Sequence, residues 1–177
     1  MRIVVKIGTS TLAYPGGRLN IRHTEALVQV WSDIKNAGHE LIIVSSGATG
    51  LGVGKLQISR PKDMVTKQAA AAVGQCELMY VYDKPFAEYN PTVAQLLLTG
   101  EDIRSEQRSR NVRNTLSRLL ELGALPVITA TAAVATDELG VANTIGENDT
   151  LPAIVTAAIG EDLLVILSDT DGPSASH

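Results

Sequence analysis

The feature that most constrains this chain is a series of short, largely apolar runs that alternate with segments of helical pattern. Strands that are apolar on both faces are typical of parallel sheets, because helices cover both sides of such a sheet. The sequence therefore predicts an α/β protein with an open, mostly parallel sheet between helical layers. The expected strands are Ile3–Val5, Leu41–Val44, Thr92–Leu98, Leu125–Ile128 and Leu163–Leu167.

Four helices are expected between these strands. The first should begin after Asn20, whose side chain can accept a hydrogen bond from the first turn, and should end at Gly38. The long alanine-rich helix contains a proline, so we expect a break near Lys84–Pro85. The helical segments are 21–36, 62–89, 110–122 and 150–159, and the apolar face of the first consists of Ala26, Leu27, Val30 and Ile34.

The composition indicates one globular domain. The chain has 177 residues, of which 45% are hydrophobic, and its mean hydropathy is +0.12. Its net charge of −4 argues against a dedicated DNA or RNA binder. Because no apolar run reaches the roughly 20 residues that span a bilayer, and Met1–Val5 enters a strand at once, we expect no membrane segment and no signal peptide.

Cys76 is the single cysteine, so no disulfide can form within the chain. This composition fits a reducing cytoplasm, which is the location we expect. Cys76 lies in a helical pattern, and we interpret it as a packing residue.

Two stretches that follow the first two strands carry groups suited to an anionic ligand. Lys6 and the Gly8-Thr9-Ser10 turn would place a cation and free N–H groups at the carboxyl edge of the sheet. An ordinary loop with a solvated lysine explains the same residues. Ser46, Gly47 and Ala48 begin a glycine-rich segment that we expect to be a loop, with backbone amides open to a ligand. A flexible turn is the alternative there.

Two later stretches are acidic and leave two interpretations open. In Gly146-Glu147-Asn148-Asp149-Thr150, the polar residues either cap the next helix or let Asn148 bind a ligand while Asp149 orients a lysine or a metal. In 168–172, Ser168 and Asp169 either form a plain turn or hold a ribose, a metal or a lysine.

The end of the fourth strand is unusually bare. Residues 129–133 read Thr-Ala-Thr-Ala-Ala, with no carboxylate, amide or base. In an α/β protein this is the sheet edge where ligand-binding polar groups normally lie.

Taken together and in order, these stretches resemble those of the glutamate 5-kinases, a family within the amino acid kinase superfamily. The resemblance extends from Arg2 to about Gly172. It implies an amino acid kinase fold, with 1–172 as the N-terminal, amino-acid-binding portion of the kinase domain and 173–177 as a short tail. The stretches that carry it are 5–10, 44–48, 67–75, 95–99, 111–115, 146–149 and 168–172.

The resemblance implies an enzyme that uses ATP and Mg²⁺ to phosphorylate the γ-carboxylate of L-glutamate, the first step of proline synthesis. Lys6 would contact the ATP phosphates and act in catalysis, with Gly8 and Thr9 beside it. Ser168 and Asp169 would border the nucleotide. Glutamate would be bound by Ser46, Gly47, Ala48 and Asn148, and Asp149 would organise the active-site lysines. A homodimer or homotetramer and feedback inhibition by proline are also implied, with neither nucleic acid nor membrane as a partner.

Two departures from the family stand out. Where the family has Asn-Glu-Asn-Asp, whose aspartate helps to hold the α-amino group of glutamate, residues 129–132 read Thr-Ala-Thr-Ala. Asp137 and Glu138 follow, and neither is assigned the missing role. The family's kinase domain also continues well past the Asp-Gly turn, so we expect a chain truncated on its C-terminal side.

Three hypotheses follow. The first is a glutamate 5-kinase. The second is a non-catalytic or partial member that retains the fold, an oligomer interface or a regulatory ligand site. The third is a superfamily kinase for carbamate, aspartate, N-acetylglutamate or a nucleotide, against which the 67–75 stretch and the Glu-Asn-Asp triplet count.

Overall fold

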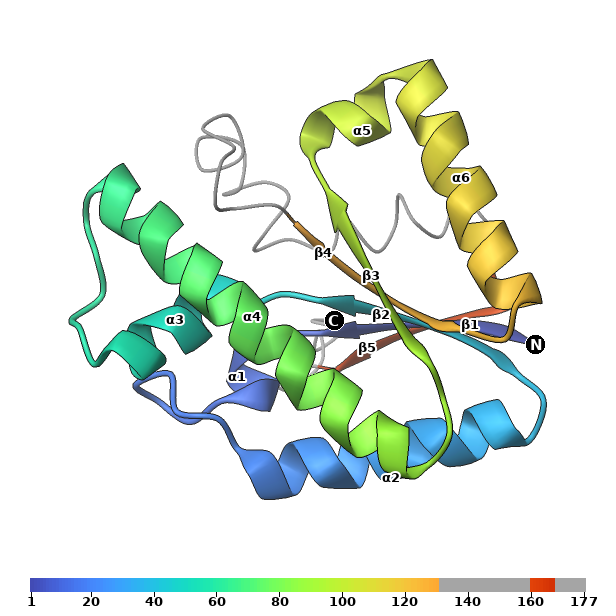
Figure 1. Cartoon of the computed structure of the whole chain (residues 1–177), viewed down its shortest axis with the longest axis horizontal. Helices are drawn as coiled ribbons and strands as arrows, with labels where there is room; N and C mark the ends of the chain where they lie inside the picture. The colour runs from blue at the N-terminus through green and yellow to red at the C-terminus, as the bar shows by residue number, and fades with distance from the viewer. Residues whose placement is uncertain (131–159, 168–177) are drawn as a thin grey trace, which may run out of the picture.

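The strands form one parallel sheet, as the sequence predicts. A computed structural model describes residues 1–130 and 160–167, and its five strands lie in the order β3-β4-β2-β1-β5, with every neighbouring pair parallel (Figure 1). Each strand begins or ends within a few residues of its expected position. The strands are β1 (Arg2–Ile7), β2 (Glu40–Ser45), β3 (Val93–Leu98), β4 (Leu125–Ala130) and β5 (Leu163–Leu167).

Helices cover both faces of this sheet. α5 and α6 lie on one face, and α2 and α4 lie on the other together with α1 and α3 (Figure 1). The helices are α1 (Thr9–Leu12), α2 (Ile21–Asn36), α3 (Ala48–Leu56), α4 (Met64–Glu88), α5 (Gly100–Arg104) and α6 (Glu106–Glu121). The expected helix at 150–159 lies outside the described residues. None of the described helices is long and apolar enough to cross a bilayer.

The sheet separates two hydrophobic cores. Along β1, Val5 belongs to the core shared with α2 and α4, whereas Val4 belongs to the core shared with α6. This alternation follows from the pleat of a strand, which turns successive side chains to opposite faces. Burial on both faces explains why the central strands β1, β2 and β4 read as largely continuous apolar runs.

The N-cap expected for helix α2 is confirmed, but the expected buried face of this helix is wrong. The Asn20 side chain accepts a hydrogen bond from the His23 N–H at 3.2 Å, and the helix ends before Gly38, which has a φ of +88°. The buried stripe, however, is centred on Trp31, whose ring stacks on Phe86 of α4. The packing of this large ring sets the rotation of the helix, so Ala26 and Val30 face solvent.

Helix α4 runs unbroken through Pro85, so the expected break is wrong. The proline lies in the last turn, where its missing N–H removes one hydrogen bond near the helix end. The next residue, Phe86, is completely buried against Trp31 and holds this end of the helix in the core. Cys76 on the same helix is exposed, which corrects its assignment as a packing residue.

The glycine-rich segment after β2 is a helix, α3, and not the expected loop. A side chain at Gly52 would overlap the backbone of Ala70 on α4, and one at Gly74 of α4 would overlap the backbone of Ala48. At Gly54 it would overlap Gly17. These glycines allow three backbones to approach closely, and this packing stabilises a helix that intrinsic propensity disfavours.

Candidate functional site

The carboxyl ends of parallel strands meet at one edge of the sheet, and this edge is the candidate site. β1 and β2 are neighbours in register, with Lys6 beside Val44 and Ile7 beside Ser45. The Ser46 N–H donates to the Ile7 carbonyl oxygen at 3.2 Å. The structure thus brings the first two predicted stretches, 6–10 and 46–48, into direct contact.

Gly47 joins these two stretches. It is the N-cap of α3 and has a φ of +113°, in the left-handed region that favours glycine. A Cβ at this position would lie only 2.8 Å from Oγ1 of Thr9, the first residue of α1. No side chain caps the first turn of α3. The turn therefore presents backbone N–H groups beside the β1 loop, an arrangement suited to a negatively charged ligand.

Lys6 lies on the face of the sheet opposite to the one that α2 and α4 cover. The pleat of β1 places Lys6 with Val4, on the α6 side, and its side chain is half-buried. Four other predicted site residues, Asn148, Asp149, Ser168 and Asp169, lie outside the described residues. Within 1–130 and 160–167, no group of three or more His, Cys, Asp or Glu side chains could hold a metal ion.

The last residue of β2 is tied to α4. The Ser45 hydroxyl and the Tyr82 phenol oxygen lie 2.8 Å apart, and both groups are buried. Burial raises the pKa of Tyr82 far above its usual value, although its hydrogen bond with Ser45 acts in the opposite direction. The phenol is therefore neutral and serves to hold Ser45, the residue before Ser46.

The bare end of β4 receives a polar partner from the same helix. Gln75 Nε2 donates to Thr129 Oγ1 at 3.1 Å, and Thr129 is only 2% exposed. The amide that the local sequence lacks thus comes from a residue 54 positions earlier. The sequence pattern did not reveal this contact, because Gln75 lies within a helix and far from Thr129 in the chain. The seven-residue spacing of Gln75 and Tyr82, two turns of one helix, is the signal that could have revealed a shared face.

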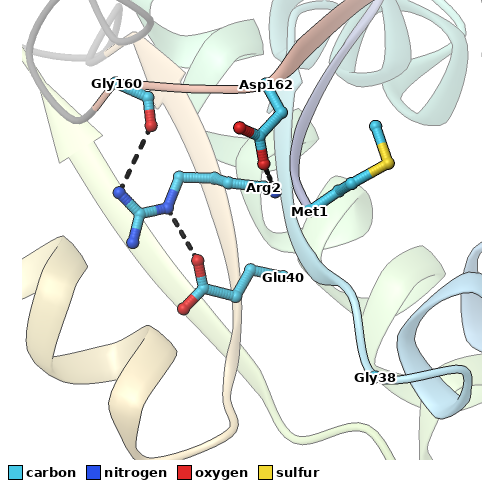
Figure 2. Close-up of a pocket in the computed structure, with 6 residues that line it drawn as sticks. All are labelled: Met1, Arg2, Gly38, Glu40, Gly160 and Asp162. Atoms are coloured by element: carbon cyan, nitrogen blue, oxygen red, sulfur yellow. Dashed lines mark hydrogen bonds and ion pairs between the residues drawn. The ribbon is translucent and has the colours of Figure 1, made fainter.

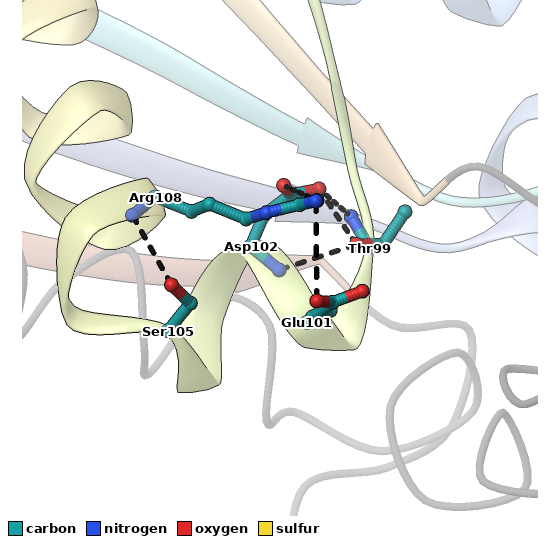
Figure 3. A network of polar contacts seen from close by, with 5 residues as sticks. All are labelled: Thr99, Glu101, Asp102, Ser105 and Arg108. Atoms are coloured by element: carbon teal, nitrogen blue, oxygen red, sulfur yellow. Dashed lines mark hydrogen bonds and ion pairs between the residues drawn. The ribbon is translucent and has the colours of Figure 1, made fainter.

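The polar groups at the end of β3 bind one another (Figure 3). The Thr99 hydroxyl donates to Asp102 at 2.7 Å in a reciprocal cap of α5, and the Arg108 guanidinium reaches the other Asp102 oxygen at 3.2 Å. Burial raises the pKa of Asp102, but the hydrogen bonds from Thr99 and Arg108 outweigh it and leave the pKa below its usual value. These residues stabilise the turn into α6.

An open hollow lies at the opposite, amino edge of the sheet (Figure 2). Arg2 donates from Nε to Glu40 at 2.7 Å and from Nη1 to the Gly160 carbonyl oxygen at 3.3 Å. Its backbone N–H donates to Asp162 at 2.6 Å. Because these groups bind one another across three strands, we interpret the hollow as a structural junction and place the site at the carboxyl edge.

Residues 1–172 match the amino acid kinase family. Among known proteins, the chain is similar to the glutamate 5-kinase of Clostridium perfringens, with 49% identity over 172 residues, 97% of this chain and 64% of that protein. For the glutamate 5-kinase of Clostridium tetani, the identity is 50% over 171 residues, 96% of this chain and 62% of that protein. The chain therefore spans less than two thirds of the length of these relatives.

Proposed function

The chain belongs to the amino acid kinase family, and from this premise we propose that it phosphorylates the γ-carboxylate of L-glutamate with ATP. The product is L-glutamyl 5-phosphate, at the start of proline synthesis. The observation that supports this proposal most strongly is the contact of the β1 and β2 loops around Thr9 and Gly47, which gathers backbone N–H groups at the carboxyl edge. The similarity to proteins named glutamate 5-kinase supports the choice of substrate.

The chemistry suits this set of groups. A carboxylate is already ionised at pH 7, so its attack on a phosphoryl group needs alignment and charge neutralisation more than a strong base. In the proposal, Lys6 with the Gly8 and Thr9 amides neutralises phosphate charge. Ser46 with the Gly47 and Ala48 amides binds the acceptor carboxylate.

The residues outside the described ranges keep their proposed roles. Asn148 completes the glutamate site and Asp149 orients the lysines, while Ser168 and Asp169 border the nucleotide. When bound on the ATP phosphates, Mg²⁺ supplies further charge neutralisation. The described residues contain no cluster of side chains that could hold this ion. The roles proposed above therefore assign no residue of 1–130 or 160–167 to the metal.

We also propose a homodimer or homotetramer in the cytoplasm with feedback inhibition by proline. Light scattering tests the assembly, and a molar mass equal to one chain contradicts it. A proline titration of the glutamate-dependent rate tests the inhibition.

The function is tested by trapping the acyl phosphate with hydroxylamine in the presence of ATP, Mg²⁺ and glutamate, while ADP is measured in parallel. Aspartate and N-acetylglutamate serve as competing acceptors and address the alternative kinases. Lys6→Met should abolish the product, whereas Lys62→Met, which changes an exposed lysine, should not.

A second variant restores Asn-Glu-Asn-Asp at 129–132. Product from this variant alone supports the alternative that the present chain retains the fold without turnover, because the bare β4 end then limits acceptor binding. If neither protein yields glutamyl hydroxamate while both are folded, the proposed function is wrong.

A further inference from the structure

Ser45 and Thr129 occupy equivalent places on neighbouring strands. The register pairs Val44 of β2 with Ile128 of β4, and each hydroxyl residue follows directly. Both residues are 2% exposed, and both turn towards α4. Two buried hydroxyls thus lie side by side, Ser45 as the last residue of β2 and Thr129 as the residue before the last in β4.

One helix supplies the partners of both hydroxyls. Tyr82 and Gln75 of α4 are seven residues apart, so two helical turns place them on the same face. Their contacts with Ser45 and Thr129 measure 2.8 and 3.1 Å. The helix therefore holds the last buried residues of β2 and β4 at a defined separation.

The two contacts differ in their surroundings. The Tyr82 side chain is completely buried between Trp31 and the sheet, as part of the hydrophobic core. Gln75 is half-buried, nearer the carboxyl edge. Thr129 is too deeply buried to contact a ligand itself, but it lies directly before the half-buried Ala130, the last residue of β4.

We propose that Gln75 and Thr129 are a positioning pair for the acceptor side of the site. Their hydrogen bond fixes the end of β4 beside the end of β2, and thereby sets the affinity for an amino acid acceptor at Ser46, the residue that follows Ser45. The identity of this acceptor as glutamate rests on the proposed function. The effect of the hydrogen bond on the β4 end does not.

The kinetic test uses near-isosteric changes in the whole chain. Thr129→Val and Gln75→Met each remove one partner and keep the volume, whereas Thr129→Ser keeps the hydroxyl. Gln68→Met, on α4 seven residues before Gln75, is the matched control. Loss of one hydrogen bond should raise the KM for glutamate roughly three- to tenfold, with the KM for ATP unchanged within about twofold.

Further outcomes separate positioning from general stability. Thr129→Ser should keep the wild-type KM for glutamate. The double variant Thr129→Val, Gln75→Met should raise this KM no further than either single variant, because both substitutions remove the same contact. Equal changes in both KM values, or a full effect in Gln68→Met, would overturn the proposal. If Thr129→Val does not fold, the half-buried Gln75→Met carries the test.

Amide hydrogen exchange keeps this proposal distinct from the proposed function. In a protein that does not phosphorylate glutamate, Thr129→Val and Gln75→Met should still speed exchange at 127–130 by roughly three- to tenfold, because one hydrogen bond is lost. Exchange in β1 should not change. Unchanged exchange at 127–130 in both variants overturns the positioning role, whatever the enzyme assay shows.

Discussion

Among single residues, Gly47 has little freedom to change. Gly47→Ala would place a Cβ in the left-handed region and 2.8 Å from Thr9 Oγ1. The conformation alone costs about 1–2 kcal/mol, and the contact adds to it. We expect the free energy of unfolding, measured in urea, to fall by about 2–3 kcal/mol.

Gly38→Ala is the matched control for this prediction. Gly38 has a φ of +88°, but a Cβ there meets nothing within 4 Å. It should therefore show the conformational cost of about 1–2 kcal/mol alone. Equal losses in the two variants would mean that the Thr9 contact relaxes without cost, and that the two loops are less tightly coupled than the structure indicates.

Tyr82 gives the protein a specific alkaline pH dependence. Because burial raises its pKa, the phenol stays neutral in the folded state while the unfolded chain ionises near pH 10. The stabilisation is therefore complete below pH 10 and is lost as the pH rises above it. Above pH 10, the wild-type free energy of unfolding should fall more steeply than that of Tyr82→Phe, by up to about 1.4 kcal/mol per pH unit.

The same variant reports the hydrogen bond at neutral pH. Tyr82→Phe leaves the buried Ser45 hydroxyl without its closest partner, and we expect a loss of about 1–2 kcal/mol at pH 7. The double variant Tyr82→Phe, Ser45→Ala is the control and should recover part of this loss. Parallel pH profiles for Tyr82→Phe and the wild type would contradict the raised pKa.

Among the elements, the backbones of α3 and α4 pack so closely that no Cβ fits between them at Gly52 or Gly74. Alanine in a helix is favoured over glycine by about 0.8–1 kcal/mol, yet Gly52→Ala and Gly74→Ala would drive a Cβ into a backbone of the other helix. Overpacking of this kind costs about 1–3 kcal/mol or more. Both variants should therefore lower the melting temperature measured by circular dichroism.

Gly50→Ala provides the comparison for these two variants. Its Cβ would lie 2.9 Å from Thr9 Cγ2, a single methyl group, and would meet no backbone atom of another segment within 4 Å. We expect a smaller change than at Gly52 or Gly74, within about 1 kcal/mol in either direction. If Gly52→Ala stabilises the protein by the full helix propensity, the close approach of α3 and α4 is wrong.

The strands and the helices differ in how far the sequence predicts them. Strands such as 3–5 and 41–44 are read correctly because burial on both faces makes them continuously apolar. Helix α3 is missed because its glycines disfavour helix locally, and only contact with α4 and Gly17 explains them. The face of α2 is misread because Trp31, rather than the periodicity, decides its rotation.

In the candidate site, too, some contacts follow from the order of the strands and others only from the packing of the helices. Strand ends that adjoin in a parallel sheet, such as those carrying Thr9 and Gly47, can be brought together by topology alone. The contact of Gln75 with Thr129 depends on how α4 crosses the sheet, which no local pattern encodes. At Thr129, the bare local sequence therefore does not mean that a polar partner is lacking, because Gln75 supplies one from a distant helix.

In the whole molecule, the two edges of the sheet differ in the groups that they carry. The carboxyl edge holds amides and hydroxyls in partly exposed segments at Gly8–Ser10 and Ser46–Gly47. At the amino edge, Arg2 joins β1 to β2 through Glu40 and to the start of β5 through Gly160 and Asp162. Residues 160 positions apart in the chain are thereby connected. We expect the loss of this junction to loosen β5 locally and to have less effect on the stability of the remaining sheet.

Asp162→Ala tests that dependence. It removes the acceptor of the Arg2 N–H, while the Asp162 backbone N–H keeps its bond to the Arg2 carbonyl oxygen at 2.9 Å. Since exposed polar contacts contribute only about 0–1 kcal/mol, the global free energy of unfolding should fall by less than about 1 kcal/mol. Amide exchange at 163–167 should nevertheless quicken about threefold or more, because β5 opens locally.

Glu161→Ala is the control for this variant, since it removes the adjacent carboxylate without touching the bond to Arg2. It should leave exchange in β5 at the wild-type rate. A uniform increase across β5, β4 and β3 after Asp162→Ala would show that the junction stabilises the entire sheet. Local opening confined to 163–167 is the expected result, because β5 pairs with β1 through a short ladder and half-exposed side chains such as Leu163 and Ile166 add little burial to hold it.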